Sequence, residues 1–149
     1  MLDTGCVWDG YFSDFDRNFA LGHATDEAID AHEKLIDATT SAVLSIRPGI
    51  TRSKDLFHTM SEVLYPGRDQ SDLKLDDVGR LGHGLGIQLT EPPSHTVWDE
   101  TIIMPGMALT IEPSIVYGKQ NYLMVAEENI FITDNGFEYL SKPRSRKLK

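Results

Sequence analysis

The sequence predicts a single α+β domain over residues 1–149, with helices covering one face of a curved antiparallel sheet. Three observations predict it: a β-hairpin pattern at the start, two amphipathic helical segments behind it, and strand-like segments from Gly79 onward. Strands followed by helices and then by more strands are typical of α+β proteins, in which the helices gather on one side of the sheet.

The opening hairpin is predicted over residues 3–19, because Asp9-Gly10 is a strong signal for a two-residue turn. A two-residue loop there places Gly5 opposite Asp14. Since side chains alternate along a strand, Asp3 and Asp14 then lie on one face as a diagonal pair. Their backbones are roughly 7–8 Å apart across the two strands. Both carboxylates can reach a common cation, although surface hairpins also carry solvated aspartates.

Two helices are predicted next, over residues 25–47 and 52–65. Thr25 is a suitable N-cap for the first helix, and Pro48-Gly49 ends it. The second helix stops at Pro66-Gly67. The apolar stripe predicted for the first helix consists of Ile29, Leu35, Ile36, Val43 and Leu44.

The last part of the chain predicts strands, separated by proline and glycine pairs. The expected strands are about 83–90, 107–112, 122–133 and 137–140.

Composition narrows the class of protein. The net charge of −9 argues against a nucleic-acid partner, since phosphate recognition requires a basic face, and the basic tail from Lys142 to Lys149 is expected to be a frayed terminus. No stretch reaches the ~20 apolar residues of a membrane span, so no membrane partner is expected. The single cysteine, Cys6, is expected to be a buried small hydrophobe, and it fits a reducing, cytoplasmic compartment.

Five side chains are candidate metal ligands. One imidazole among four carboxylates is a hard donor set, suited to divalent cations that activate water. They are Asp3, Asp14, His83, Glu112 and Glu127.

The residues alone leave their convergence open. A lone histidine such as His83 is more often a structural hydrogen-bonding group than a ligand. Glu112 ends an apolar strand, where a buried carboxylate without a partner is costly. Alternation along 122–133 does not choose between Glu127 and Glu128.

The local contexts of these residues resemble the pita-bread metallohydrolases, the family of methionine aminopeptidases, Xaa-Pro dipeptidases and aminopeptidases, and creatinase. The similar segments follow in the family's order and cover nearly the whole chain. They are LDTGCVWDGYFSDFDRNFALG, RLGHGLGIQLTEPPS, MPGMALTIEPSI and EENIFITDNGFEYLS. The resemblance implies the pita-bread fold and maps the last metal-binding glutamate to Glu127.

The resemblance also implies two divalent ions, manganese or cobalt first, with iron or zinc as alternatives. Asp14 and Glu127 would bridge both ions, Asp3 would hold one, and His83 and Glu112 would hold the other. A hydroxide between the ions would attack a polarised carbonyl, with Glu112 moving the proton. Glu112 and His83 are therefore the expected catalytic residues.

Two features depart from the family pattern. Peptidase members carry a second histidine seven positions after the metal histidine, where this chain has Thr90. Thr90 and His95 are the substrate-binding candidates, although His95 also fits a structural role. Arg17 is a candidate to hydrogen-bond a metal-binding carboxylate, with an exposed hairpin arginine as the alternative.

The second departure is length, because the strands and helices that precede the first aspartate in the family are absent. The chain therefore looks like the C-terminal part of a pita-bread catalytic domain with the N-terminal half missing. Such a half-fold exposes an apolar edge and face, and we expect a homodimer or association with the missing segment.

The leading function predicted is a dinuclear-metal hydrolase of the Xaa-Pro peptidase type, acting on a small peptide. A small-metabolite C–N hydrolase of the creatinase or ectoine hydrolase kind, acting on an amide or amidine, has similar weight because of Thr90. A truncated, non-catalytic binding module is the third possibility, and the chain could be inactive alone.

Overall fold

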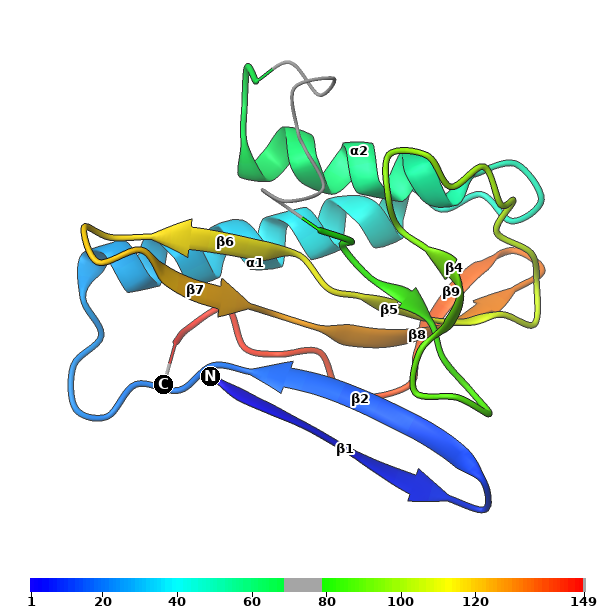
Figure 1. Cartoon of the computed structure of the whole chain (residues 1–149), viewed down its shortest axis with the longest axis horizontal. Coiled ribbons are helices and arrows are strands. Elements are labelled where there is room, and N and C mark those ends of the chain that lie inside the picture. Colours follow the sequence, from blue (N-terminus) through cyan, green and yellow to red (C-terminus); the bar gives the residue numbers. More distant parts are fainter. Residues whose placement is uncertain (69–78, 149) are drawn as a thin grey trace.

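The computed structural model describes residues 1–68 and 79–148. Two helices lie on one side of the main sheet, and the opening hairpin lies on the other side (Figure 1). The helices are α1 (Asp26–Ser45) and α2 (Ser53–Leu64). The strands are β1 (Leu2–Trp8), β2 (Tyr11–Arg17), β3 (His83–Gly84), β4 (Glu91–Ser94), β5 (Ala108–Ile111), β6 (Ser114–Tyr117), β7 (Tyr122–Val125), β8 (Glu128–Thr133) and β9 (Gly136–Tyr139).

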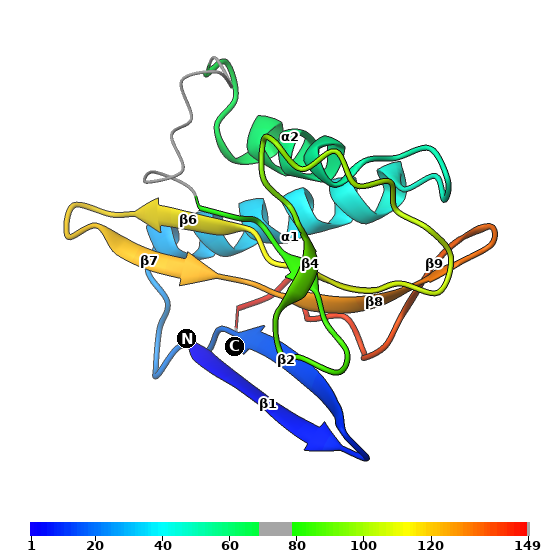
Figure 2. The same ribbon diagram turned by 45° about the vertical axis from the view of Figure 1, so that its right-hand side comes forward.

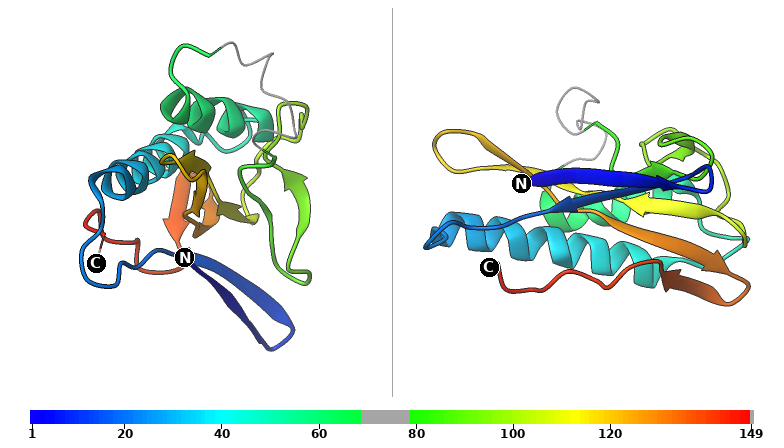
Figure 3. Two further views of the ribbon diagram at one scale, coloured as in Figure 1. Left: turned by 60° about the vertical axis from the view of Figure 1, so that its left-hand side comes forward. Right: turned by 90° about the horizontal axis from the view of Figure 1, so that it is seen from below.

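All strand pairs are antiparallel, and they form one sheet of order β4-β3-β5-β8-β9 with two separate hairpins, β1-β2 and β6-β7. Figure 2 and the left view of Figure 3 show the hairpin β1-β2 below the main sheet. The predicted α+β class and helix-covered antiparallel sheet are confirmed.

The first helix begins where the sequence predicts, because the Thr25 hydroxyl accepts a hydrogen bond from the Ala28 amide at 3.2 Å. Of the predicted apolar stripe, Leu35 and Val43 are buried as expected, whereas the other buried positions of the helix are largely small residues. Ile29 is 36% exposed and Leu44 is 73% exposed. The residues that face the core are Ala28, Ala31, His32, Leu35, Ala38, Thr39, Ala42 and Val43.

Two of the predicted strands are interrupted. The segment 83–90 is a strand only at His83–Gly84, and 122–133 divides into β7 and β8. Two short strands were not predicted. In β4, the proline pair at Pro92-Pro93 hid an edge strand, because proline normally signals a turn.

The C-terminal tail packs against the body instead of fraying. The Ser145 carbonyl lies 3.1 Å from the ring nitrogen Nε2 of His32, and Arg146 forms an ion pair with Asp37 at 2.7 Å. Arg144 is 6% exposed and donates to Thr39. Lys149 lies outside the described residues.

Strand β1 is exposed along its whole length. Cys6 is therefore exposed, with its sulfur 3.3 Å from the Ser13 hydroxyl, and the prediction that it is buried is wrong. The physical reason is that no described residue covers the hairpin's outer side. Trp8, which is 82% exposed, shows how much apolar surface this leaves in water.

Within the described residues, no helix is both long enough and apolar enough to cross a membrane.

Candidate metal centre

Two carboxylates lie opposite each other in a two-stranded ribbon, in which β5 and β6 form one side and β8 and β7 form the other. Ile111 of β5 pairs with Glu128 of β8, and Ser114 of β6 pairs with Val125 of β7 in the same register. The intervening Glu112 therefore lies opposite Glu127, and the Ala126 amide donates to the Pro113 carbonyl at 3.1 Å between the two ladders. Residues directly opposite each other share a face, so both side chains point to the same side of the ribbon.

The hairpin β1-β2 adds the aspartates. Its register places Gly5 opposite Asp14, as predicted, and Asp3 opposite Asp16. A side chain at Gly5 would collide with the backbone carbonyl of Ser13, so the tight pairing of these strands requires glycine there.

Polar side chains, rather than a strand ladder, hold β2 against the ribbon. Asn129 donates to the Asp14 carbonyl, Arg17 donates to the Glu127 carbonyl, and Asn18 donates to the Val125 carbonyl at 2.7 Å. These bonds join the backbones that carry Asp14 and Glu127, and thereby fix their spacing.

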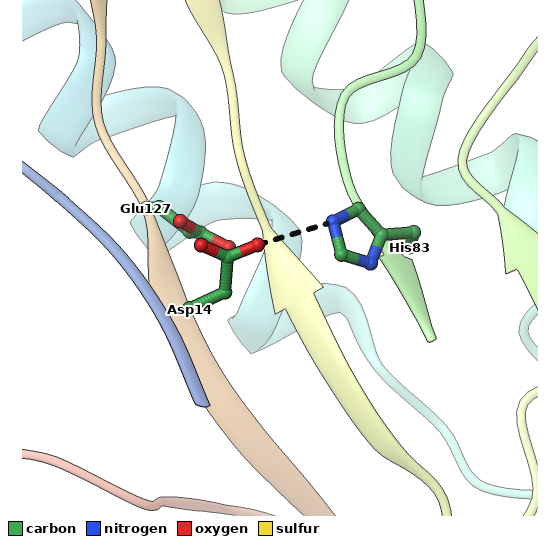
Figure 4. A group of neighbouring side chains, drawn as sticks. All are labelled: Asp14, His83 and Glu127. Carbon is green, nitrogen blue, oxygen red and sulfur yellow. Dashed lines mark ion pairs between the residues drawn. The ribbon is translucent and has the colours of Figure 1, made fainter. Parts of the chain in front are cut away.

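His83 approaches from β3 with one nitrogen directed at the acids. Its Nδ1 lies 2.9 Å from the Gly84 carbonyl, which can only accept, so Nδ1 carries the proton. The opposite nitrogen, Nε2, lies 3.8 Å from Asp14 Oδ2 and 3.7 Å from Glu112 Oε2. Figure 4 shows His83, Asp14 and Glu127 facing one another.

The electrostatics of this cluster are unfavourable without a cation. Burial, together with the charges of Glu112 and Asp14, raises the pKa of Glu127 to about 9. Burial and the charge of Asp16 raise the pKa of Glu112 to about 7. Burial lowers the pKa of His83, so its imidazole is neutral and its Nε2 lone pair faces the carboxylate oxygens.

These donors fit a divalent cation. Ligand atoms of Asp14, His83 and Glu127 lie within 4.8 Å of one another. The Oε1 atom of Glu127 is buried and has no hydrogen-bond partner among the described residues. A buried carboxylate oxygen and an imidazole lone pair that face each other both need a positive charge between them.

Comparison with known proteins identifies the family. Residues 1–134 match the model of "Metallopeptidase family M24". The chain belongs to metallopeptidase family M24. The predicted membership of the pita-bread metallopeptidases is thereby confirmed.

The similar M24 proteins are dipeptidases and aminopeptidases. A Xaa-Pro dipeptidase of Pyrococcus furiosus is 31% identical over 144 residues, which are 95% of this chain and 39% of that protein. A solved dipeptidase structure from Pyrococcus horikoshii has a TM-score of 0.84 at 30% identity and covers 98% of this chain and 39% of its own. An X-Pro aminopeptidase from Thermotoga maritima has a TM-score of 0.81 at 25% identity, covering 96% and 39%.

These structures confirm the predicted pita-bread fold. The M24 chain described here spans only about 39% of the length of the relatives that it matches.

The structure separates Glu127 from its neighbour Glu128. Glu127 faces Asp14 and His83, whereas Glu128 forms an ion pair with Arg17 at 3.0 Å and lies 3.7 Å from Arg144. Alternation along the strand sends the two side chains to opposite faces.

Asp3 and Glu112 lie at the rim of this group. Asp3 sits on the same hairpin face as Asp14, and its charge adds to the burial that raises the pKa of Asp14. Glu112 contacts the group through His83. Neither belongs to the three residues whose ligand atoms lie within 4.8 Å of one another.

Arg17 contacts different groups from those expected. It was predicted to hydrogen-bond a metal-binding carboxylate, but it donates to the backbone carbonyl of Glu127 and to the carboxylate of Glu128. Its guanidinium also lies over the Phe15 ring, 5.1 Å from the centroid.

The two substrate-binding candidates have different surroundings. Thr90 is exposed, and its hydroxyl accepts a hydrogen bond from Arg80 at 3.2 Å. His95 is fully buried, with Nδ1 2.8 Å from the Ser53 hydroxyl, and burial lowers its pKa to about 4. A side chain with no exposed surface has a structural role in this conformation, so the placement of His95 does not support contact with a substrate.

Sequence reasoning missed Asp16 of β2. It is 4% exposed, and burial together with the charges of Asp3 and Asp14 raises its pKa to about 6. The signal was present in the hairpin register, because Asp16 lies opposite Asp3 and two residues from Asp14.

Gly82 is expected to be essential for placing His83. It has a positive φ of 132°, and a Cβ there would collide with the Thr110 carbonyl and lie 2.7 Å from Cδ2 of His95. We expect Gly82→Ala to lower the free energy of unfolding by about 2–3 kcal/mol, measured by urea denaturation. Gly106→Ala is the control, because it has a similar positive φ of 92° with nothing within 4 Å of the added Cβ. Equal losses in both variants would contradict the crowding at Gly82.

Proposed function

We propose that this M24 chain carries the metal centre of a dinuclear-metal hydrolase that cleaves the peptide bond of Xaa-Pro substrates. The observation that carries the proposal is the convergence of Asp14, His83 and Glu127 within 4.8 Å, with Glu112 opposite Glu127 across the ribbon. Family membership and the relatives' names, Xaa-Pro dipeptidase and X-Pro aminopeptidase, support it.

In this proposal, Asp14 and Glu127 would help to hold both ions. Their carboxylates face each other from β2 and the ribbon, which suits a bridging role (Figure 4). Asp3 would bind on the hairpin side, and His83 with Glu112 on the side of β3. Manganese or cobalt suits this mainly oxygen donor set, with iron or zinc as alternatives. When bound, the ions would supply an activated water and polarise the scissile carbonyl.

Glu112 is the residue proposed to move the proton. It is 3.7 Å from His83 Nε2 and partly exposed, so it can reach both the centre and a bound molecule. A carboxylate in this position can accept a proton and then donate it. We infer that it takes the proton from the attacking water and delivers it to the leaving amine.

Thr90 favours a second candidate function. Peptidase members of the family carry histidine at this position, and a hydroxyl held by Arg80 cannot replace an imidazole in acid–base chemistry. A small-metabolite C–N hydrolase is therefore the alternative, with an amide or amidine as substrate.

The test combines metal content with substrate preference. The purified chain is expected to bind two manganese ions, measured by elemental analysis, and then to hydrolyse a Xaa-Pro dipeptide faster than a Met-Xaa dipeptide or a cyclic amidine. Preference for the amidine would favour the alternative function. Failure to bind two ions would contradict the proposed dinuclear centre and favour a non-catalytic binding module.

The exposed hairpin supports a partner. We propose that a second copy, or a segment matching the rest of the relatives' length, covers β1, whose side chains Val7 and Trp8 are 55% and 82% exposed. Sedimentation of the chain alone is expected to show a dimer. A stable monomer at micromolar concentration, with the M24 metal content intact, would contradict the homodimer.

A further inference from the structure

Asp16 occupies a place on the hairpin that faces the candidate centre. It lies directly opposite Asp3 in the β1-β2 ladder and two residues from Asp14 on β2. Opposite residues share a face, and so do residues two apart on a strand, so all three side chains point the same way. That face is turned to the ribbon, because carboxylate atoms of Asp14 and Glu127 lie within 4.8 Å of each other.

The Asp16 carboxylate is buried without the partners that a buried acid needs. The residue is 4% exposed, and its Oδ1 atom has no hydrogen-bond partner among the residues the structure describes. The neighbouring Arg17 donates to the backbone carbonyl of Asp16, at 3.0 Å, and not to its carboxylate. An unsatisfied carboxylate oxygen at this depth is costly, and carboxylates in proteins are relieved of that cost by cations.

Arg144 does not fill this role. Its guanidinium donates to Thr39 and lies 3.7 Å from the Glu128 carboxylate. Within the described part of the chain, no ion pair joins it to Asp16. The charge of Arg144 acts on Asp16 from a distance and lowers the pKa of that carboxyl against the larger effect of burial. The Oδ1 atom of Asp16 still has no direct partner among the described residues, and the same hairpin face holds two candidate metal ligands.

We propose that Asp16 is a further metal-ligating carboxylate, binding the cation on the Asp3 side of the centre. The inference rests on the proposed dinuclear function and adds a sixth protein ligand to it. Two divalent ions carry four positive charges, which four carboxylates already balance. The fifth carboxylate adds negative charge on one side only, and so makes the two metal positions unequal.

The unequal positions have a chemical consequence. The Asp3 side would be surrounded by oxygen alone, from Asp3, Asp14, Asp16 and Glu127, whereas the other side includes the imidazole of His83. Oxygen-only sites suit manganese and magnesium, and imidazole suits zinc and iron. We therefore expect the Asp3 side to prefer Mn²⁺ over Zn²⁺.

The experiment is manganese titration of the full chain, followed by calorimetry and by the electron paramagnetic resonance of free Mn²⁺. In Asp16→Asn, one of the two ions is expected to bind at least about 10-fold more weakly while the other is unchanged. Asp9→Asn is the matched control, because it removes the same charge from the same hairpin at its turn.

Each outcome decides something. Two ions bound with equal strength in Asp16→Asn and Asp9→Asn would overturn the role of Asp16 while leaving the dinuclear centre intact. A wild-type chain that binds fewer than two ions would instead overturn the proposed function. Circular dichroism verifies folding, and Asp16→Ser provides a second neutral variant if the amide is not tolerated. A parallel Zn²⁺ titration tests the metal preference, and a fall in Zn²⁺ affinity alone in Asp16→Asn would contradict the predicted preference for Mn²⁺.

Discussion

Asp14→Asn is expected to abolish the binding of both divalent ions. The Asp14 carboxylate lies between His83 and Glu127, with Oδ2 3.8 Å from His83 Nε2. An amide at this position loses the negative charge and one of the two ligand oxygens. Removing groups that merely orient ligands costs 10–100-fold in metal affinity, so loss of a shared ligand should cost at least about 100-fold. Elemental analysis after dialysis against manganese measures this directly.

The same variant should be more thermally stable than the wild type when both are free of metal. Burial and the charge of Asp3 raise the pKa of Asp14, which shows that its ionised form is disfavoured there. A neutral amide removes that repulsion. A higher melting temperature combined with lost metal therefore separates ligand removal from misfolding. Retention of two manganese ions by Asp14→Asn would show that the assignment of ligands is wrong.

The metal-free chain is expected to lose stability as the pH rises from 5 to 8. The folded pKa of Glu127, about 9, is above its usual value of 4.5, so the folded state keeps a proton that the unfolded state releases. Stability is then fully present below pH 4.5 and falls until the pH reaches about 9. The loss of unfolding free energy between pH 5 and 8 is on the order of a few kcal/mol.

Two controls test the cause of this pH dependence. Glu127→Gln should reduce the pH dependence of the unfolding free energy, because the amide does not titrate, and should leave the part that comes from Glu112 and Asp16. Manganese should restore wild-type stability more at pH 8 than at pH 5, since metal binding requires deprotonated ligands. A metal-free wild type that grows more stable between pH 5 and 8 would contradict the buried, repelling carboxylates at this centre.

Local sequence signals predicted the parts of the fold whose geometry is set by neighbouring residues. The turn at Asp9-Gly10 fixed the hairpin register, and counting outward placed Gly5 opposite Asp14 correctly. Thr25 predicted the start of α1 because an N-cap accepts a hydrogen bond from an amide only three residues further on, here that of Ala28.

Features that depend on distant partners were not predictable in this way. Glu127 and Glu128 are both buried, and only pairing with a strand about fifteen residues away determines which of them faces His83. The alanine-rich buried stripe of α1 was missed because the prediction looked for large apolar residues at helical spacing, whereas a closely packed core also buries small ones.

Asp16 was overlooked for a different reason. Its position on the hairpin face followed from the same counting that placed Asp3 and Asp14. Its burial did not, because the covering ribbon comes from the far end of the chain.

The strand pairs β5-β8 and β6-β7 share one continuous register, and this determines where residues can be inserted or deleted without moving Glu112 away from Glu127. The turn at Lys119-Gln120 joins β6 to β7 beyond the pair of glutamates, so a loop grafted there leaves Glu112 opposite Glu127. Deleting Pro113 shifts Glu112 by one place against its partner strand and rotates it toward the helices. Changes of chain length at these two places should therefore give opposite results: an insertion at the turn is tolerated, and the deletion of Pro113 is not.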